Sequence, residues 1–369
     1  MNVIDLKLYD FRNYRELEIG FDPGVNLIVG NNAQGKTNLL EAVTYLGSGR
    51  SFRTQRTGEM VRFTADFADI QGTVFSENRE QQLRWVLFSG SRPRQIWRNG
   101  TKKKTAADIS GVLQTVLFCP EDLMVLKTGA AMRRRLGDNA LCQLRPNYEA
   151  ALTEYNRILE QKNRILKDRH ENPGLLNILP EYNTRLCQVG ALLISYRVRF
   201  YEGLGKAAKS YHESFSGGAE EFSLQYKTVS TVSDPFAPVE TLTGNLLDHL
   251  QSHYRAELES SQCLTGPHKD DFAVCLSGID LRAYGSQGQT RTAAISLKLA
   301  QRELMEKATG QMPVLLLDDV LSELDPGRQD FVLNQIKEGQ VFITCCEPGR
   351  FTKLGKTVEI LNGELRIEN

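Results

Sequence analysis

The first 130 residues carry short apolar runs whose spacing is typical of strands. Apolar residues alternate with polar ones at Ile4, Leu6 and Leu8, and again at Leu17, Ile19 and Phe21 after the polar turn Arg12-Asn13. This period of two predicts an antiparallel hairpin. Further strands are expected at residues 25–29, 70–75, 83–88, 95–97 and 116–119.

The pattern changes near residue 132, where apolar residues begin to recur every three to four positions. We expect one amphipathic helix over residues 136–166, a break at residues 171–174, and a second helix over residues 179–196 that runs antiparallel to the first. A strand at residues 222–229 and a helix over residues 239–261 follow. Residues 131–262 are therefore predicted to form an inserted, mainly helical domain.

From Thr265 onward the chain alternates between short strands and helices. Strands are expected at residues 272–276, 279–283, 314–317 and 341–343, and helices over residues 288–307 and after Pro326. The last two strands are apolar throughout, as in a parallel sheet that is covered on both faces. Residues 1–130 and 263–369 are together predicted to form an α/β head into which the helical domain is inserted.

Eight consecutive residues fit the P-loop pattern G-x-x-x-x-G-K-[ST]: Gly30, Asn31, Asn32, Ala33, Gln34, Gly35, Lys36 and Thr37. They lie between the predicted strand at residues 25–29 and a helical run at residues 38–43. In such a strand–loop–helix, the loop N–H groups and the helix N-terminus bind the phosphates of a nucleotide. We expect ATP as the ligand, with Lys36 at the β- and γ-phosphates and Thr37 on Mg²⁺. The alternative is a glycine-rich turn that only opens a helix.

A P-loop also needs a carboxylate that holds the metal from a neighbouring strand. Asp318 follows the apolar run 314–317, at the edge where open α/β sheets bind ligands. We expect Asp318 to hold the water shell of Mg²⁺ and the next residue, Asp319, to orient or deprotonate the attacking water. The alternative is a strand that ends in an acidic helix cap.

Two further motifs lie near this strand. Ser286-Gln287-Gly288-Gln289 begins a predicted helix, and Ser322-Glu323-Leu324-Asp325 follows Asp319. A serine and a glycine backbone at a helix N-terminus offer a second place for a phosphate. The alternative for Ser286 is an ordinary N-cap.

Composition and charge limit the possible classes of protein. The 45 basic and 45 acidic residues balance, so any affinity for nucleic acid must come from local patches. Among seven cysteines without C-x-x-C spacing, we expect small buried thiols at Cys119, Cys275, Cys345 and Cys346, which lie in apolar runs. Because the sequence shows neither a secretory signal nor an apolar stretch of membrane-spanning length, we expect a cytoplasmic protein.

The order of these motifs resembles that of the SMC/Rad50-type branch of ABC ATPases. In closer detail the chain resembles the RecF family of bacterial DNA replication and repair proteins, in stretches that span nearly all of it: residues 11–14, 30–41, 49–53, 120–123, 265–271, 286–291 and 315–325. The resemblance implies a two-lobed ABC-type ATPase head, with a P-loop sheet and an antiparallel β subdomain.

The resemblance also carries functional expectations. It implies that Ser286, Gly288 and Gln289 close on the ATP of a second subunit in an ATP-dependent homodimer. It implies DNA binding at single-strand/double-strand junctions and work with RecR and RecO in loading recombinase at gaps. Weak, slow ATP hydrolysis would release the DNA. Asp319 stands where many relatives have glutamate, and its shorter side chain fits slow hydrolysis. Lys269, Gly137 and Cys345-Cys346 are further departures from the family pattern.

Two basic runs are candidates for DNA contact. Lys102, Lys103 and Lys104 follow the turn Asn99-Gly100, and Arg133, Arg134 and Arg135 open the helical domain. Either run can equally be solvated surface. The roles of Arg50, Arg53 and His268 stay open, because each fits a phosphate contact or a structural interaction.

The functional hypothesis is a DNA-repair ATPase whose ATP-bound dimer clamps DNA. The first alternative is an ATP-binding scaffold for repair partners without useful turnover. The second is the ATPase subunit of a transporter, which the helical insertion and the lack of a switch histidine disfavour.

Overall fold

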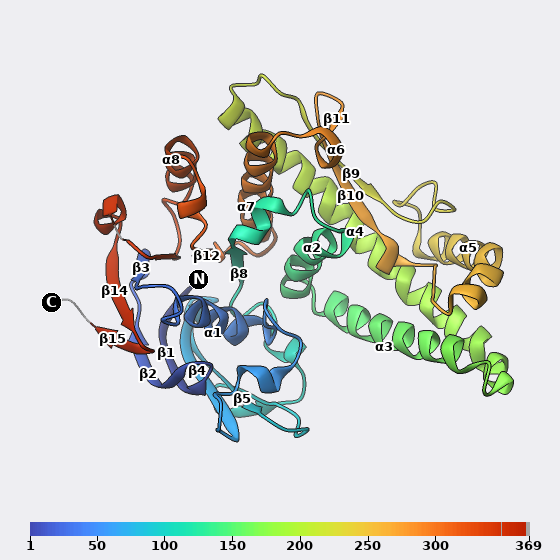
Figure 1. Ribbon diagram of the computed structural model, residues 1–369, viewed down its shortest axis with the longest axis horizontal. Coiled ribbons are helices and arrows are strands. Elements are labelled where there is room, and N and C mark those ends of the chain that lie inside the picture. The colour runs from blue at the N-terminus through green and yellow to red at the C-terminus, as the bar shows by residue number, and fades with distance from the viewer. Residues whose placement is uncertain (348, 367–369) are drawn as a thin grey trace. The chain divides into compact units, whose positions relative to one another are not determined.

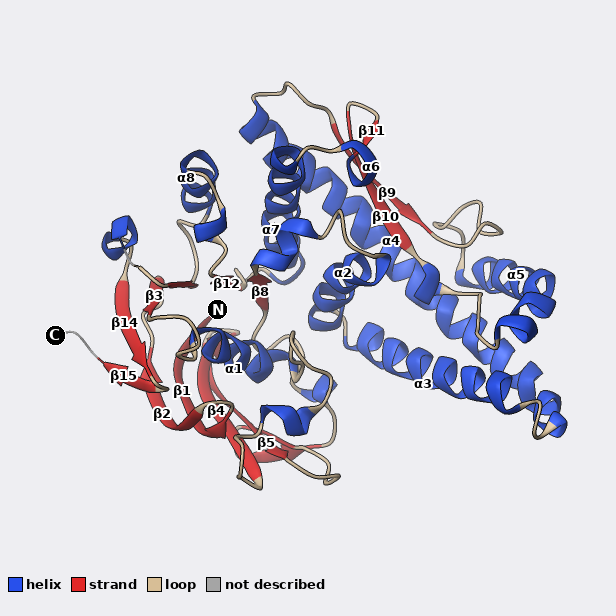
Figure 2. Ribbon diagram, viewed as in Figure 1, coloured by secondary structure: helices blue, strands red, loops and turns tan. Residues whose placement is uncertain are grey.

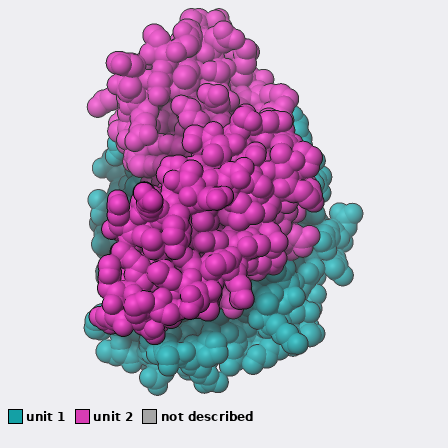
Figure 3. Space-filling model, turned by 90° about the vertical axis from the view of Figure 1, so that its right-hand side faces the viewer, with its two compact units in different colours: residues 1–123, 298–369 teal, residues 124–297 magenta. Residues whose placement is uncertain are grey.

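The computed structural model describes residues 1–347 and 349–366, and the chain divides into two compact units (Figure 3). Unit 1 comprises residues 1–123 and 298–369, and unit 2 comprises residues 124–297. The second boundary between them falls within helix α7 (Gln287–Thr309). The expected head and insertion, divided near residues 130 and 263, stay a prediction.

The first sheet of unit 1 is antiparallel and has the strand order β2-β1-β4-β5-β6-β7, of which Figure 1 labels the first four strands. The predicted hairpin is confirmed, because Leu6 pairs with Ile19 and Leu8 with Leu17. Strand β7, which holds two of the three lysines of the first basic run, was not predicted. The strands are β1 (Asn2–Phe11), β2 (Tyr14–Gly20), β4 (Phe67–Ser76), β5 (Arg79–Phe88), β6 (Gln95–Arg98) and β7 (Thr101–Lys103).

The second sheet of unit 1 carries the P-loop strand and has the order β15-β14-β3-β13-β12-β8. Its strands pair in parallel from β14 to β8, and β15 adds an antiparallel edge. The four predicted apolar strands are confirmed, whereas β14 and β15 were missed. The strands are β3 (Val25–Val29), β8 (Thr115–Phe118), β12 (Val314–Asp318), β13 (Val341–Cys345), β14 (Lys356–Leu361) and β15 (Glu364–Arg366).

Helix α1 (Lys36–Ser48) joins the two sheets of unit 1 into one hydrophobic core. Its apolar residues Leu39, Leu40, Val43 and Leu46 are fully buried. They belong to one cluster with residues of the first sheet, such as Leu6 and Trp85, and of the second, such as Leu316 and Phe342. The start of α1 is therefore held by packing on both sides.

Helix α8 (Pro326–Gln335) follows β12 in the chain, and it confirms the helix that was expected after Pro326.

Unit 2 is mainly helical and contains one small antiparallel sheet of order β11-β10-β9 (Figure 2). Helix α4 packs against both α3 and α5, and strand β9 lies along it. The helices are α2 (Ala130–Leu144), α3 (Pro146–Asp168), α4 (Leu179–Ser216), α5 (Val239–Ser260) and α6 (Leu281–Tyr284), and the strands are β9 (Phe222–Lys227), β10 (Asp271–Leu276) and β11 (Ile279–Asp280).

Three predictions about these elements were wrong. The single helix over residues 136–166 is two helices, because Pro146 cannot donate to the i−4 carbonyl and restricts the residue before it. The strand over residues 279–283 ends at Asp280, whose side chain accepts a hydrogen bond from the Arg282 N–H and caps the short helix α6. The second helix was underestimated in length, since α4 continues to Ser216, where Gly217 ends it in a left-handed conformation.

The expected burial of four cysteines is only partly observed. Cys345 is buried, whereas Cys119, Cys275 and Cys346 are partly exposed. Among the residues that the structure describes, we find no helix with the length and apolar character needed to cross a bilayer.

Candidate nucleotide site

The carboxyl ends of three neighbouring parallel strands carry the candidate site of unit 1. Strand β3 leads into the P-loop, β12 ends at Asp318, and β13 leads to Cys346. Residue pairing places Asp318 beside Thr344, and Cys345 beside Val29. The parallel register is what brings Val29 and Cys345, which are more than 300 positions apart in the sequence, to one edge of the sheet.

Two glycines of the P-loop are required by close backbone contacts. A Cβ atom at Gly30 would lie 2.4 Å from the Ile360 carbonyl oxygen. Gly35 has a φ of 120°, and a Cβ there would lie 2.7 Å from the side-chain nitrogen Nδ2 of Asn13. The motif is thus a tightly enclosed loop that opens helix α1, and packing requires glycine at both positions.

The acid that was expected to hold the metal lies beside the P-loop threonine. The Thr37 hydroxyl donates to Asp318 Oδ1 at 3.1 Å, and the Thr344 hydroxyl donates to the same oxygen at 2.8 Å. Asp318 is 7% exposed, and burial raises the pKa of its carboxyl group, helped by the nearby charges of Asp319 and Glu121. Its negative charge therefore faces two neutral hydroxyl groups in a poorly solvated place.

Lys36, the P-loop lysine, is folded back onto its own loop. Its ammonium group donates to the carbonyl oxygens of Gly30 at 2.5 Å and Asn31 at 3.1 Å, and to the Cys346 sulfur at 3.5 Å. The side chain is buried. Among the described residues, the acceptors of this buried cation are neutral, so it is suited to receive an anion.

The residues that brace the P-loop were not identified from the sequence, although two of them lie in the stretch 11–14. Asn13 donates to the Gln34 carbonyl at 2.8 Å, and the Tyr14 hydroxyl donates to the Gly35 carbonyl at 2.9 Å. From the turn after β14, the Gly363 N–H also donates to the Gln34 carbonyl, at 3.2 Å. The available signal was the polar Arg12-Asn13 turn, which we interpreted as a hairpin and as part of the family resemblance, but not as a contact of the P-loop.

Arg12 and Arg53 meet at one buried carboxylate of helix α1. Arg12 donates to both oxygens of Glu41, at 2.8 and 2.7 Å. Arg53 lies 3.8 Å from Glu41 and donates to Asn38 at 2.6 Å. The sequence left two roles open for Arg53, a phosphate contact or a structural interaction. In this conformation Arg53 has the structural role.

Asp319 adopts a left-handed backbone conformation, with a φ of 52°. Its N–H donates to Thr344 Oγ1 at 2.8 Å, and Ser322 donates to its carbonyl at 2.6 Å and to its carboxylate at 3.2 Å. Thr344 therefore links Asp318 and Asp319 through one hydroxyl group, a role that the sequence did not reveal.

The serine motif lies in unit 2, at the start of α7. Ser286 Oγ accepts from the Gln289 N–H at 3.2 Å, and Gln289 Oε1 accepts from the Ser286 N–H at 3.0 Å, which is a capping box. Gln289 also donates to Glu220 at 2.7 Å. Ser286 is exposed, so this N-cap arrangement leaves the serine accessible.

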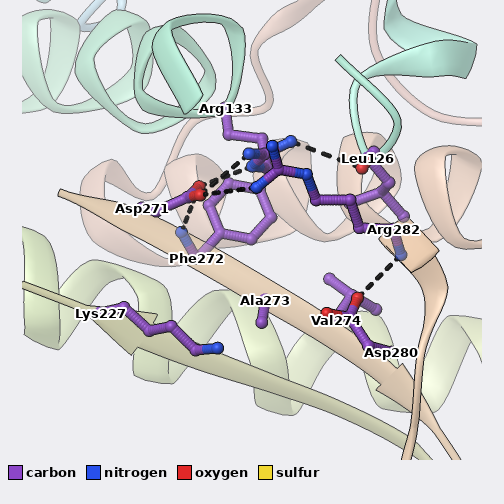
Figure 4. A pocket seen from close by; sticks show the side chains of 9 residues that line it. All are labelled: Leu126, Arg133, Lys227, Asp271, Phe272, Ala273, Val274, Asp280 and Arg282. Carbon is purple, nitrogen blue, oxygen red and sulfur yellow. Dashed lines mark hydrogen bonds and ion pairs between the residues drawn. The ribbon is translucent and has the colours of Figure 1, made fainter. Parts of the chain in front are cut away.

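The second basic run is not uniform. Arg133 is buried and binds Asp271 through two hydrogen bonds of 2.6 and 2.9 Å, in a hollow that Arg282 and Lys227 also line (Figure 4). Arg134 is half-buried and Arg135 exposed. Arg133 therefore belongs to the internal structure of unit 2, against the expectation that it faces DNA. In unit 1, Lys102 and Lys104 are exposed and Lys103 is partly so.

His268 acts as a hydrogen-bonding residue inside unit 2. Its Nε2 donates to the Cys263 carbonyl at 3.0 Å, which leaves Nδ1 to accept from the Tyr155 hydroxyl at 2.7 Å. Burial lowers the pKa of His268 to about 4. These contacts favour the structural role over a phosphate contact.

Comparison with known proteins identifies the family. The family model for the RecF/RecN/SMC N terminal domain matches residues 2–368. A DNA replication and repair protein RecF of Agathobacter rectalis is 38% identical over 100% of this chain and 99% of its own length. The RecF of Clostridioides difficile is 36% identical, over 100% of this chain and 99% of its own.

Solved structures agree with this result. The recombination mediator protein RecF-ATP in the RecFOR pathway has a TM-score of 0.91 and 32% identity, over 100% of this chain and 97% of the other. An Smc head domain bound to the C-terminal winged-helix domain of ScpA has a TM-score of 0.57 at 17% identity, over 99% and 96%, and shares the fold. The architecture is that of an ABC-type ATPase head, and the chain belongs to the RecF family.

Proposed function

We propose that this chain binds Mg·ATP at the P-loop edge of unit 1. The observation that carries the proposal is the 3.1 Å contact between Thr37 and the buried Asp318, next to a lysine whose acceptors in the described part of the chain are neutral. The related RecF-ATP structure supports the choice of nucleotide. Gly30 to Thr37 would surround the phosphates, with Lys36 at the β- and γ-phosphates.

The same edge fits a magnesium ion. Asp318 is a buried carboxylate whose pKa is raised by burial and by the nearby charges of Asp319 and Glu121, and the Thr37 hydroxyl lies beside it. Thr37 and Asp318 would hold Mg²⁺, which supplies charge neutralisation for the phosphates. Asp319, linked to Asp318 through Thr344, would orient the attacking water, and we propose weak hydrolysis that DNA stimulates.

The ATP site is proposed to be completed by a second copy of the chain. Ser286, Gly288 and Gln289 at the start of α7 would close on the phosphate held by the partner subunit. The exposure of Ser286 at a helix N-terminus supports this assignment. We therefore propose an ATP-dependent homodimer that clamps DNA. Hydrolysis of ATP would release the DNA.

We assign DNA contact to the edge of the first sheet. Residues 77–104 contain eight basic and two acidic side chains, whereas the whole chain is neutral. Trp97 lies between Arg84 and Lys102, which approach its ring centre to 5.1 and 5.6 Å. We propose that Lys102, Lys103 and Lys104 bind phosphates here, with Arg134 and Arg135 as a second contact and without Arg133.

The proposed biological role is recombinational repair and replication. We propose binding at junctions of single- and double-stranded DNA, and cooperation with RecR and RecO in loading recombinase at gaps. The membership in the RecF family and the RecFOR pathway named for the solved relative support this role. A cytoplasmic location fits the free state of the seven cysteines.

Sedimentation tests the shared-site clamp directly. The mass is measured with Mg·ATP and with Mg·ADP, each with and without a labelled gapped duplex. We expect ATP to double the mass and only the dimer to carry DNA, and we expect Ser286→Arg to bind ATP as a monomer. A Ser286→Arg protein that dimerises normally would exclude the shared site.

The scaffold alternative remains a second candidate because the chain has no histidine after its last core strand and carries Asp319 at the water-positioning place. Single-turnover hydrolysis separates the two hypotheses. A scaffold releases no phosphate above background, with or without DNA, whereas the proposed ATPase does.

A further inference from the structure

Cys346 lies directly against the P-loop. Its thiol donates to Asn32 Oδ1 at 3.0 Å and accepts from the Lys36 ammonium group at 3.5 Å. It is partly exposed. The thiol thus links two P-loop side chains that stand four residues apart.

The sheet fixes this position. Strand β13 pairs in parallel with β3, and Cys345 is aligned with Val29, the last residue before the P-loop. The next residue on each strand therefore leaves the sheet at the same edge, so Cys346 emerges beside Gly30 and Asn31. The placement follows from the register and does not depend on a long, adaptable side chain.

Of the three acceptors of Lys36, the thiol is the one that a phosphate most easily replaces. Gly30 and Asn31 offer carbonyl oxygens, which are strong acceptors, at 2.5 and 3.1 Å. Sulfur is a weak acceptor and lies at 3.5 Å. A phosphate oxygen that reaches Lys36 would therefore take the place of the sulfur.

We propose that Cys346 is a positioning residue that competes with the nucleotide for Lys36: its thiol holds the ammonium group at the mouth of the P-loop in the nucleotide-free protein, and the nucleotide phosphate displaces the thiol. The inference rests on the proposed function of this edge as an ATP site. Two consequences follow. Bound nucleotide covers the thiol, and atoms added to the sulfur occupy the phosphate position.

Alkylation with N-ethylmaleimide tests both consequences on the folded, unaltered protein. The sulfur forms a bond to one alkene carbon, the thiol proton ends on the other, and nothing leaves. We expect Mg·ATP to slow the alkylation of Cys346 at least about tenfold, measured by peptide mass spectrometry, and to leave the partly exposed Cys275 of unit 2 unaffected. The alkylated protein should bind a fluorescent ATP analogue at least about tenfold more weakly, and Cys275→Ser should keep this sensitivity.

Two substitutions separate positioning of Lys36 from a merely structural role. Cys346→Ala removes a competitor for the ammonium group and should strengthen ATP binding about threefold, whereas Cys346→Ser supplies a better acceptor and should weaken it by a similar factor. Shifts in the same direction would overturn the proposal.

The outcomes distinguish this inference from the function on which it rests. If the untreated protein binds ATP but Cys346 is alkylated at the same rate with and without it, the inference is wrong and the ATP site stands. If the untreated protein binds no ATP, the proposed function is wrong and the inference with it.

Discussion

Each unit of the molecule buries a charged cluster, and the two clusters differ in how their charges are satisfied. In unit 1, Lys36 and Asp318 are 6% and 7% exposed, and within the described residues neither forms an ion pair. In unit 2, Arg197 is 3% exposed and forms ion pairs with Asp138 and Asp270, each at 2.9 Å. The comparison separates charges that are suited to a ligand from charges that stabilise the fold.

The unit 2 cluster has partners from several elements, although Asp270 Oδ1 has none among the described residues. Arg197 also donates to the Pro267 carbonyl at 2.6 Å, and Tyr148 donates to Asp138 at 2.5 Å. Tyr226 adds a further hydrogen bond to Asp270. A network of this kind fixes helix α4 against the stretch 265–271, so that stretch, although shared with the family pattern, is structural in this chain.

The largest effect is expected from Arg197→Leu. It leaves the buried Asp270 without its cation, so we expect the free energy of unfolding to fall by about 3–5 kcal/mol. Urea denaturation measures this, and Arg197→Leu combined with Asp270→Asn should recover part of the loss. An Arg197→Leu protein as stable as the parent would mean that the network is not structural.

Acid should destabilise the same unit through His268. In the unfolded chain the His268 imidazole is protonated as the pH falls through about 6.5. In the folded chain its pKa is about 4, so it stays neutral at that pH. Acidification from 6.5 to 4 therefore favours unfolding, by up to about 3 kcal/mol. The unfolding free energy of the parent should fall more steeply across this window than that of His268→Gln, and parallel curves would contradict the assignment.

Lys36→Ala should affect binding without affecting the fold. Loss of the ammonium group should weaken ATP binding about 100-fold, or about 2.7 kcal/mol, and change the unfolding free energy by less than about 1 kcal/mol.

Lys298 provides the matched control for this prediction. It is a buried lysine of unit 1 that is already paired, with Asp122 at 2.9 Å. Lys298→Ala should destabilise the protein and leave the intrinsic ATP affinity of the folded fraction intact. If Lys36→Ala instead destabilised the protein and Lys298→Ala weakened the intrinsic ATP affinity, the distinction between ligand-facing and structural charges would be wrong.

Asp318→Asn should have only a small effect on stability. Because burial raises the pKa of Asp318, its ionised form costs folding free energy at neutral pH. The amide should stabilise the protein by about 1 kcal/mol at pH 7, with no gain below the ordinary pKa of 3.8, while Mg²⁺-dependent ATP binding is lost. Thermal unfolding at several pH values measures the sign, and destabilisation at pH 7 would contradict it.

The elements of the parallel sheet were predictable because their signals are local. A run of four apolar residues before Asp318, and the spacing of Gly30, Gly35 and Lys36, depend only on neighbours in the chain. Pro146 was also a local signal for the division of the long helix. We did not use it, because apolar residues recur with a helical period on both sides of it. Strands β14 and β15 were missed, although Asn362-Gly363 between them is a hairpin turn.

By itself, the sequence determined the α/β head, the P-loop and its acid, and the resemblance to the RecF family. Only the tertiary structure decided that Thr344 joins Asp318 to Asp319, that Cys346 touches Lys36, and that Arg133 is buried against Asp271. The physical reason is that strand register and packing bring together positions that are 25 to 310 residues apart in the sequence. A charge or a thiol looks the same in the sequence whether its partner is solvent, a carboxylate or a phosphate-binding loop.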